Sequence, residues 1–324
     1  MFWSSKSTKL RVRATAATAL FAVAAAGAGQ AAVTTGRPGT MPSPVVTLSR
    51  LSAVRAPQRG AAGTNTATLP LYAPWGMTLA PSGDLYVANL LANQVLVYDR
   101  NLVQKTSSTI ATGLSHPSAV AFDSTGEVYV SNVASNTINV YSPNHTYLPT
   151  RTIVANVTTP TSIAIDGLDN LYVDENYAAI GVYDFHGSFV CNLPFLSNLG
   201  GINAFAQRAH FSAVAGAQQV QFIATAAELE TISGNGGFPS GGIGINDPLA
   251  VAFDGSDNLY YVAGDLALRS FNTSTSAQAV LATLPFVPAA MAVDSIRGRI
   301  FVSDLYHNAI AVYSLTGQLL QTLH

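Results

Sequence analysis

Residues 117–132 read PSAVAFDSTGEVYVSN, and this stretch decides the fold because similar sequences recur along the chain. Residues 74–89 read PWGMTLAPSGDLYVAN, and residues 160–175 read PTSIAIDGLDNLYVDE. Two further copies begin at Pro248 and Pro288. Self-similarity at a fixed interval is the sequence signature of a repeat architecture, so the period has to be settled before anything else.

The repeat has a period of about 43 residues. Its prolines are 43, 43, 88 and 40 residues apart, so the long interval spans two periods. A degenerate copy is expected inside that interval, with 211–215 as its first strand and 221–225 as part of its second. Six units of about 40–45 residues result, which is the length of a four-stranded propeller blade.

Each unit divides into the same strands. The apolar run after the proline has almost no polar alternation, which indicates a strand buried on both faces. A Gly- or Asn-containing turn follows, then an apolar-Tyr-Val strand and a third strand such as 138–141. A weaker fourth strand precedes the next proline, as in 151–154, and 318–323 is the candidate in the last unit. Because such sheets bury their faces only by stacking, the sequence predicts an all-β, six-bladed β-propeller of four-stranded antiparallel blades over residues 69–324.

The repeated motif resembles the NHL-repeat family of β-propellers. Proline, a small apolar strand, Asp, a Gly/Asn turn and an apolar-Tyr-Val strand carry the resemblance, and 136–141 and 308–313 fit the strand that follows. The family includes protein- and RNA-binding modules, surface sensor domains and some enzymes, so the resemblance alone does not choose a function. The related lactonase-like propellers hold a divalent metal in the central channel through Glu, Asn and Asp.

Charge is scarce and unevenly distributed. Only 10% of the 324 residues are charged, against about 25% in typical soluble proteins. From residue 66 onward the chain has seven basic and 17 acidic residues. A surface that tracks nucleic-acid phosphates needs clustered Lys and Arg, so nucleic-acid binding is not expected.

The N-terminus predicts export. A basic segment from Lys6 to Arg13 is followed by an apolar run over 14–28 and by small residues suited to cleavage. Residues 1–31 are therefore interpreted as a secretory signal peptide, with no stable membrane span after its removal. Residues 32–68, rich in Ala, Thr, Pro and Gly, are interpreted as a flexible linker. The predicted location is secreted or extracytoplasmic, in the periplasm or at the cell surface.

Most of the conspicuous side chains have a structural explanation. Tyrosines recur at one position of the second strand and one of the third, which is typical of packing between blades. The recurring aspartates before the turns are expected to accept backbone N–H groups. The single cysteine, Cys191, is expected to be a buried, inert thiol.

The residues that close the second strands are the candidate site. Equivalent positions of a propeller form a ring, so these side chains are expected to face a common channel mouth. They are Asn89, Asn132, Glu175, Thr225, Ala263 and Asp304. Oxygen ligands suit hard cations, and Glu175, Asp304 and Asn132 are the candidate metal ligands, with Glu175 and Asp304 facing each other across the axis. The alternative is that these residues cap the strands and meet water.

Two functions follow from this. The first is a secreted, non-catalytic binding module for a protein or glycan partner at the cell envelope, without a cofactor. It is favoured because the sequence has no Gly-x-Ser-x-Gly elbow and no phosphate-binding loop. The alternative is a lactonase-like hydrolase or lyase that depends on one divalent cation, such as calcium, in the central channel.

Overall fold

A computed structural model describes the repeat region of the chain. It describes residues 68–165, 168–175, 180–193, 202–207, 211–216, 219–224, 242–244, 249–254, 258–272 and 275–324. The predicted signal peptide, and the predicted linker up to residue 67, lie outside the described residues, so both stay predictions.

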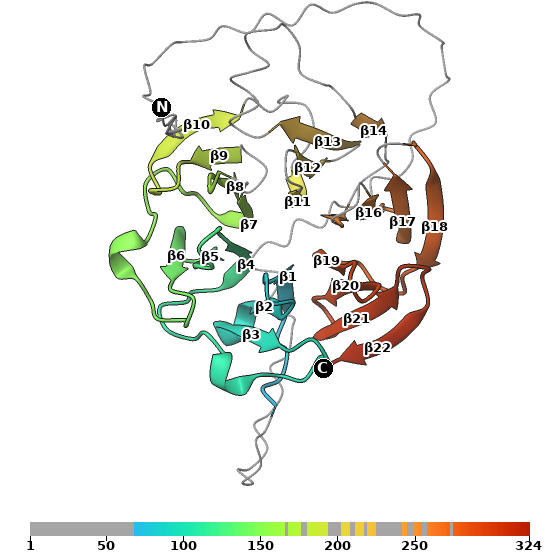
Figure 1. Ribbon diagram of the computed structural model, residues 1–324, viewed down its shortest axis with the longest axis horizontal. Coiled ribbons are helices and arrows are strands. Elements are labelled where there is room, and N and C mark those ends of the chain that lie inside the picture. The colour runs from blue at the N-terminus through green and yellow to red at the C-terminus, as the bar shows by residue number, and fades with distance from the viewer. Residues whose placement is uncertain are drawn as a thin grey trace, which may run out of the picture. The chain divides into compact units, whose positions relative to one another are not determined.

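The described strands pair in chain order into antiparallel sheets (Figure 1). The first two sheets are β1 (Pro74–Leu79), β2 (Leu85–Asn89) and β3 (Gln94–Tyr98), then β4 (Pro117–Phe122), β5 (Val128–Asn132) and β6 (Thr137–Tyr141). The next two are β7 (Pro160–Ile165), β8 (Leu171–Glu175), β9 (Ile180–Tyr183) and β10 (Phe189–Leu193), then β11 (Ile202–Gln207), β12 (Phe211–Gly216), β13 (Gln219–Ala224) and β14 (Gly242–Gly244). The last two are β15 (Ala250–Phe253), β16 (Asn258–Val262), β17 (Ala267–Asn272) and β18 (Gln278–Thr283), then β19 (Met291–Asp294), β20 (Arg299–Asp304), β21 (Ala309–Ser314) and β22 (Leu319–Leu323).

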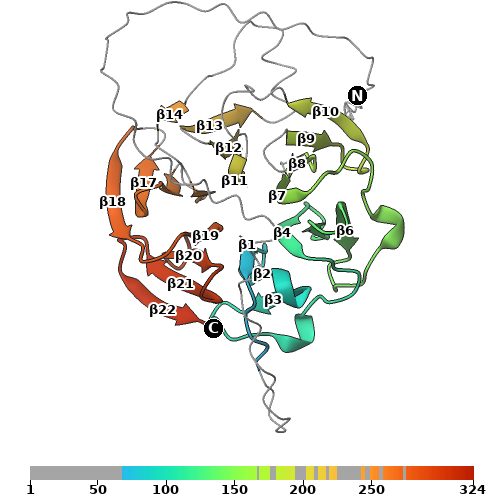
Figure 2. The ribbon, with the colours of Figure 1, turned by 180° about the vertical axis from the view of Figure 1, so that it is seen from behind.

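The first strand of each sheet lies at the centre of a ring. In this order, β1, β4, β7, β11, β15 and β19 each contact the next, and β19 contacts β1 (Figures 1 and 2). The predicted all-β propeller is therefore confirmed. Side chains are described for five of these sheets, and only the backbone for the sheet of β11–β14.

The prediction that every blade has four strands is wrong for the first two sheets. The outer place of each is taken by a loop with a 3-10 helix, η2 (Thr106–Ser108) or η3 (Pro149–Arg151), and by single bridges to the third strand. The expected strand at 151–154 is reduced to the bridge Ile138↔Ile153. Pro149 explains this in part, because its fixed φ suits the start of a helix and its missing N–H cannot join a ladder.

The prediction for the degenerate copy is wrong by one strand. The segment 211–215, expected as a first strand, lies in β12, which is the second strand of its sheet, and 221–224 lies in β13, the third. The likeness of FSAVA at 211–215 to PSAVA at 117–121 is local and lacks the proline, which explains the error. Thr225 lies outside the described residues, so its predicted place in the ring stays a prediction.

The cores lie between neighbouring sheets. One cluster joins Leu85 and Leu96 of the first sheet to Phe301 and Ile310 of the last, and similar clusters join the other described neighbours. The recurring tyrosines are buried as predicted; they are Tyr86, Tyr98, Tyr129, Tyr141, Tyr172, Tyr183, Tyr260 and Tyr313. Their aromatic rings therefore fill the inter-sheet layers and leave little of their surface to a ligand.

An asparagine in the turn after the second strand links neighbouring sheets. Its Oδ1 accepts the backbone N–H of the residue before the next first strand. The pairs are Asn93–His116 (2.7 Å), Asn136–Thr159 (2.7 Å) and Asn308–Ala73 (2.8 Å). All three asparagines have φ near +54°, a conformation that Asn tolerates better than most residues. The Asn308–Ala73 bond joins the last sheet to the first, so the ring closes without a strand exchanged between them.

The predicted turn aspartates are confirmed where the structure describes them. Asp123 Oδ1 accepts the N–H groups of Thr125 and Glu127, and Asp254 Oδ1 accepts that of Asn258.

The prediction that Cys191 is buried was wrong, because Cys191 is exposed on the outer strand β10. None of the described helices has the length and apolar character that a membrane crossing needs.

Candidate functional site

The strand-closing residues share one register position. Asn89, Asn132 and Glu175 each lie opposite the proline that starts their sheet, in the pairs Pro74↔Asn89, Pro117↔Asn132 and Pro160↔Glu175. Asp304 is likewise the last residue of its second strand, β20. The sequence therefore identified an equivalent set, and the question is what its polar atoms contact.

Asn89 and Asn132 fasten the segment that enters their own sheet. Asn89 Oδ1 accepts the N–H of Tyr72, and its Nδ2 donates to the carbonyl of Pro70 at 3.0 Å. Asn132 Oδ1 accepts the N–H of Ser115 at 2.9 Å. Both side chains are fully buried. Their amides are therefore used inside the protein, as the capping alternative expects.

Glu175 is directed toward the third strand of its sheet. Its Oε1 accepts a long hydrogen bond, 3.4 Å, from the hydroxyl of Tyr183, and the carboxylate is largely buried. A Cβ added at Gly181 would lie 3.0 Å from Oε1, so the glycine leaves the space that this contact needs. Burial raises the pKa of Glu175, and the hydrogen bond from Tyr183 offsets this only in part.

Asp304 contacts the turn that follows it. Its Oδ1 accepts the N–H of His307 at 3.1 Å, and its Oδ2 lies 2.7 Å from His307 Nδ1. The His307 side chain is 71% exposed, whereas the Asp304 side chain is 7% exposed. The carboxylate thus orients an imidazole whose other edge reaches solvent.

No described pair of these residues is brought into contact with another across the ring. The predicted ligand set of Asn89, Asn132, Glu175, Thr225 and Asp304, and the metal role of Glu175, Asp304 and Asn132, therefore stay predictions. Within the described ranges, no group of three or more His, Cys, Asp or Glu side chains is arranged to hold a metal ion.

A second set of polar residues, buried or half-buried, was missed by the sequence analysis. It lies one position earlier on the second strand and pairs with the residue after the repeat proline. Ser118 Oγ lies 2.8 Å from Ser131 Oγ and donates to the carbonyl of Pro160 at 2.6 Å. Thr161 Oγ1 donates to Asp174 Oδ2 at 2.6 Å.

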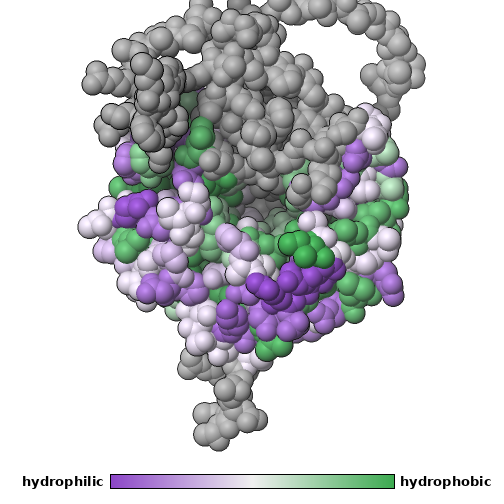
Figure 3. All heavy atoms as spheres, in the orientation of Figure 1, coloured by the Kyte–Doolittle hydropathy of each residue, from purple (hydrophilic) through white to green (hydrophobic). Residues whose placement is uncertain are grey.

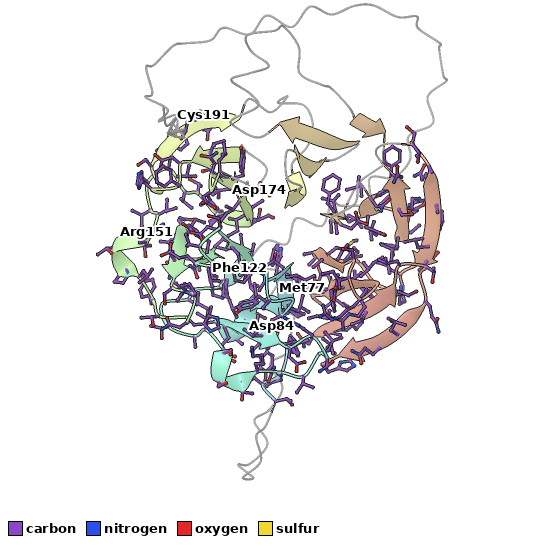
Figure 4. The ribbon with its side chains drawn as sticks, viewed as in Figure 1. Met77, Asp84, Phe122, Arg151, Asp174 and Cys191 are labelled. Carbon is purple, nitrogen blue, oxygen red and sulfur yellow. The ribbon has the colours of Figure 1, made fainter. Side chains whose placement is uncertain are left out.

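Asp174 is the only carboxylate of this inner set among the described residues, and it is 1% exposed. Figure 4 places it toward the middle of the ring, whereas Cys191 lies at the outer edge. Ser118 and Thr161 each lie where the register shifts, and a β-bulge at such a place changes the direction of the side chain. The available signal was the alignment itself, which sets Asp174 against Ala88, Ser131 and Ser303.

The histidines that the structure describes are dispersed. Besides His307, His145 contacts the hydroxyl of Tyr86 through Nε2 at 2.8 Å, between the first and second sheets. Burial, with the charge of Lys105, lowers the pKa of His145, so the neutral ring is favoured there. His145 therefore contributes to packing between sheets.

Comparison with known proteins identifies the fold. No family model matches the chain, so its resemblance to NHL repeats stays a resemblance, and no curated protein matches it either. Virginiamycin B lyase from Staphylococcus aureus superposes with a TM-score of 0.55 at 14% identity, over 79% of this chain and 86% of that one. A streptogramin B lyase gives 0.52 at 13% identity, over 74% and 93% of the two chains. Hydrazine synthase from Kuenenia stuttgartiensis gives 0.53 at 14% identity, over 79% and 99%. At these identities the likeness establishes a shared propeller fold and no shared chemistry.

Proposed function

We propose that this protein is a secreted, non-catalytic β-propeller that binds a protein or glycan partner at the cell envelope. The observation that carries the proposal is the commitment of Asn89 and Asn132 to the backbone of the entering loops. A ring of ligands or catalytic groups would need those amides to be directed toward a shared space. A rigid ring that carries loops is a common scaffold for recognition.

The proposal includes a finer description of the fold, a six-bladed propeller of the NHL type. The sheet of β11–β14 would be the fourth blade, and each blade would correspond to one sequence period. The closed order of contacts among the first strands supports this description. The motif resemblance supports the family.

Export is tested by the N-terminus of the protein that leaves the cytoplasm. The expected mature N-terminus lies between about Gly29 and Val33, by the small-residue rule for cleavage. N-terminal sequencing of the exported form reads it directly. Retention of Met1, or recovery of the protein only from the cytoplasm, would contradict secretion.

Binding is tested with the purified mature chain on immobilised envelope glycans and envelope proteins. Saturable binding to one of these, with the bound ligand recovered unaltered, is the expected result. Release of a chemically changed ligand would contradict the non-catalytic role. Absence of saturable binding to both classes would contradict the choice of partner.

A metal-dependent hydrolase or lyase is the second candidate. Two largely buried carboxylates, Glu175 and Asp304, each end a second strand, and burial raises the pKa of Glu175, so a positive charge beside it would stabilise its ionised form. A divalent cation would supply such a positive charge. Stoichiometric metal in the purified protein, a melting temperature raised by calcium through mass action, and loss of that rise in Glu175→Gln would favour this candidate.

A further inference from the structure

Basic residues are concentrated at one place in the folded body. From residue 66 onward the chain has seven Lys and Arg residues. Two of them, Arg297 and Arg299, lie in and after the turn between β19 and β20, and Arg100 follows β3 of the neighbouring sheet. In an acidic body this junction between the first and last sheets is a local centre of positive charge.

One carboxylate serves two of these arginines. Asp294 Oδ2 lies 2.6 Å from Arg299 Nη2 and 3.3 Å from Arg297 Nη1, and the Asp294 side chain is 3% exposed. Burial alone would raise the pKa of Asp294, but hydrogen bonds from Arg299 and from the backbone N–H of Arg297 outweigh it and lower the pKa. The carboxylate is therefore ionised and holds both guanidinium groups in place, yet it can neutralise only one of them.

Arg100 and Arg297 meet at Gly83. A Cβ added there would lie 3.2 Å from Arg297 Nη1 and 3.7 Å from Arg100 Nε. Arg100 Nε donates to the carbonyl of Ser82 at 2.7 Å, which anchors the side chain to the turn. A side chain at this position would crowd Arg297 but would leave Arg100 at an ordinary contact distance, so both guanidinium groups lie beside the same turn.

The neighbouring carboxylates are engaged elsewhere. Asp84 forms an ion pair with Lys105 at 2.9 Å, and Asp99 Oδ1 accepts the N–H groups of Asn101 and Val103. Among the described residues, Arg100 forms no ion pair. Arg297 thus shares the carboxylate of Asp294 with Arg299, and Arg100 has no carboxylate partner among the described residues. A bound anion would supply the counter-charge that these two guanidinium groups lack.

The third arginine, Arg299, is held by an aromatic ring and by Asp294. Arg299 lies over the ring of Phe301, with 5.4 Å from its Cζ to the ring centroid, and its side chain is 13% exposed. In the described part of the chain, its buried Nε has no hydrogen-bond partner. Arg299 therefore orients Asp294 and through it Arg297, while Arg297 and Arg100 keep donors toward solvent. Figure 3 shows hydrophilic side chains gathered on the face of the molecule over the region of β2, β3 and β21.

We propose that Arg100 and Arg297, positioned by Ser82, Asp294 and Arg299, form an oxyanion-binding site that takes a phosphate or carboxylate group of a ligand. Guanidinium forks match the paired oxygens of both groups and bind them by charge-assisted hydrogen bonds. Ile296, 88% exposed in the same turn, would contact the apolar part of such a ligand. This site is independent of the strand-closing residues and of the proposed function.

The test is a titration of the full mature chain with inorganic phosphate at constant ionic strength, against chloride, followed by calorimetry or by NMR. Glucuronate is titrated in parallel, with glucose as its uncharged control. Saturable binding of phosphate favours a phosphorylated ligand, and saturable binding of glucuronate but not glucose favours an acidic glycan. Binding of either anion supports the site. Binding of neither above the chloride background overturns it.

Variants locate the binding. Arg297→Gln and Arg100→Gln should each lower the affinity for the anion about tenfold, because each removes a charge-assisted contact. The matched control is Arg269→Gln. Within the ranges that the structure describes, Arg269, on β17, forms an ion pair with Asp265 alone, so this substitution should leave the affinity for the anion unchanged. If Arg297→Gln does not fold, Arg100→Gln decides, because Arg100 donates its hydrogen bond to the exposed carbonyl of Ser82. An equal loss of affinity in Arg269→Gln would mean that the anion is attracted non-specifically by positive charge, and this would overturn the assignment.

Discussion

The inner and outer strands of the last sheet differ sharply. β20 and β21 are buried along almost their whole length, whereas four of the five residues of β22 are exposed. The inner strands have a neighbouring sheet on each face, and the outer strand has a sheet partner on one edge only. In the first two sheets the same outer place is taken by loops with a 3-10 helix.

The inner strands carry most of the repeated sequence pattern. The inner strands must satisfy packing on both faces, so their sequence recurs from unit to unit. The outer place carries little of the core and is free to be a strand or a loop. A β-bulge in each of β10, β18 and β22 also disrupts the outer edge, which discourages pairing with other chains.

The largest expected effect is at Phe301. Its side chain is fully buried in the cluster between the first and last sheets. Phe301→Ala should lower the free energy of unfolding by about 3–5 kcal/mol, through lost transfer energy and a cavity. Leu320→Ala on β22, where the residue is 49% exposed, should change it by less than about 0.5 kcal/mol. Denaturant unfolding measures both, and similar losses would break the distinction between inner and outer strands.

The close contact of β1 with β4 gives the next effect. A Cβ added at Gly76 would lie 2.4 Å from the carbonyl oxygen of Ser118 and 2.7 Å from Ala119 Cα, both backbone atoms. Gly76→Ala should therefore cost about 1–3 kcal/mol, because neither strand can move away.

The control for Gly76 is a glycine with open space around it. At Gly126 the nearest atom to an added Cβ is 3.7 Å away, so Gly126→Ala meets only the strain of its positive φ. That strain is worth about 1 kcal/mol. A loss in Gly126→Ala larger than that in Gly76→Ala, by thermal unfolding, would mean that the inner strands are loosely packed.

The inner strands were also the part that the sequence predicted. The proline, the apolar run and the Tyr-Val strand recur because they pack between sheets, and the structure has strands at these positions. The prediction was wrong where the constraint weakens, at 151–154 on the rim and at 211–215, where the marker proline is missing. Local likeness cannot set strand order when nothing marks the start of the unit.

The candidate site was harder to predict than the fold. Alignment correctly placed Asn89, Asn132, Glu175 and Asp304 at one position, but it could not show their partners. Asn89 and Asn132 bond backbone atoms 17 to 19 residues upstream, and nearly every residue type there would supply the same atoms, proline excepted where the N–H donates. Asp174 was overlooked because its neighbours in the alignment are small or neutral, and its partner Thr161 lies at a bulge that the repeat pattern does not reveal.

A smaller effect is expected where the last sheet meets the first. Asn308→Ala removes the hydrogen bond to the N–H of Ala73, a fully buried residue, and should cost about 1–2 kcal/mol. Asn308→Gly keeps the positive φ accessible and isolates the loss of the hydrogen bond. Asn144→Ala, in an exposed turn, is the control and should stay within about 0.5 kcal/mol. If Asn308→Ala equals this control in thermal unfolding, the bond does not stabilise ring closure.

The smallest change in stability is expected on substitution of Glu175, and it is opposite in sign to the change expected for Asp294. Because burial raises the pKa of Glu175, ionising it costs stability as the pH rises from its ordinary value, about 4.3, through the raised one. Glu175→Gln should therefore be more stable than the wild type at pH 7, within about 1 kcal/mol, and equal to it at pH 3. Asp294 has a lowered pKa, so its stabilising charge is present above its ordinary value and is lost as the pH falls through the lowered one. Asp294→Asn should accordingly be less stable than the wild type at pH 7, with a gap that narrows in acid. Melting temperatures of both variants between pH 3 and pH 7 would measure this, and a destabilised Glu175→Gln at pH 7 would mean that the Glu175 carboxylate has a counter-charge, as a bound cation would provide.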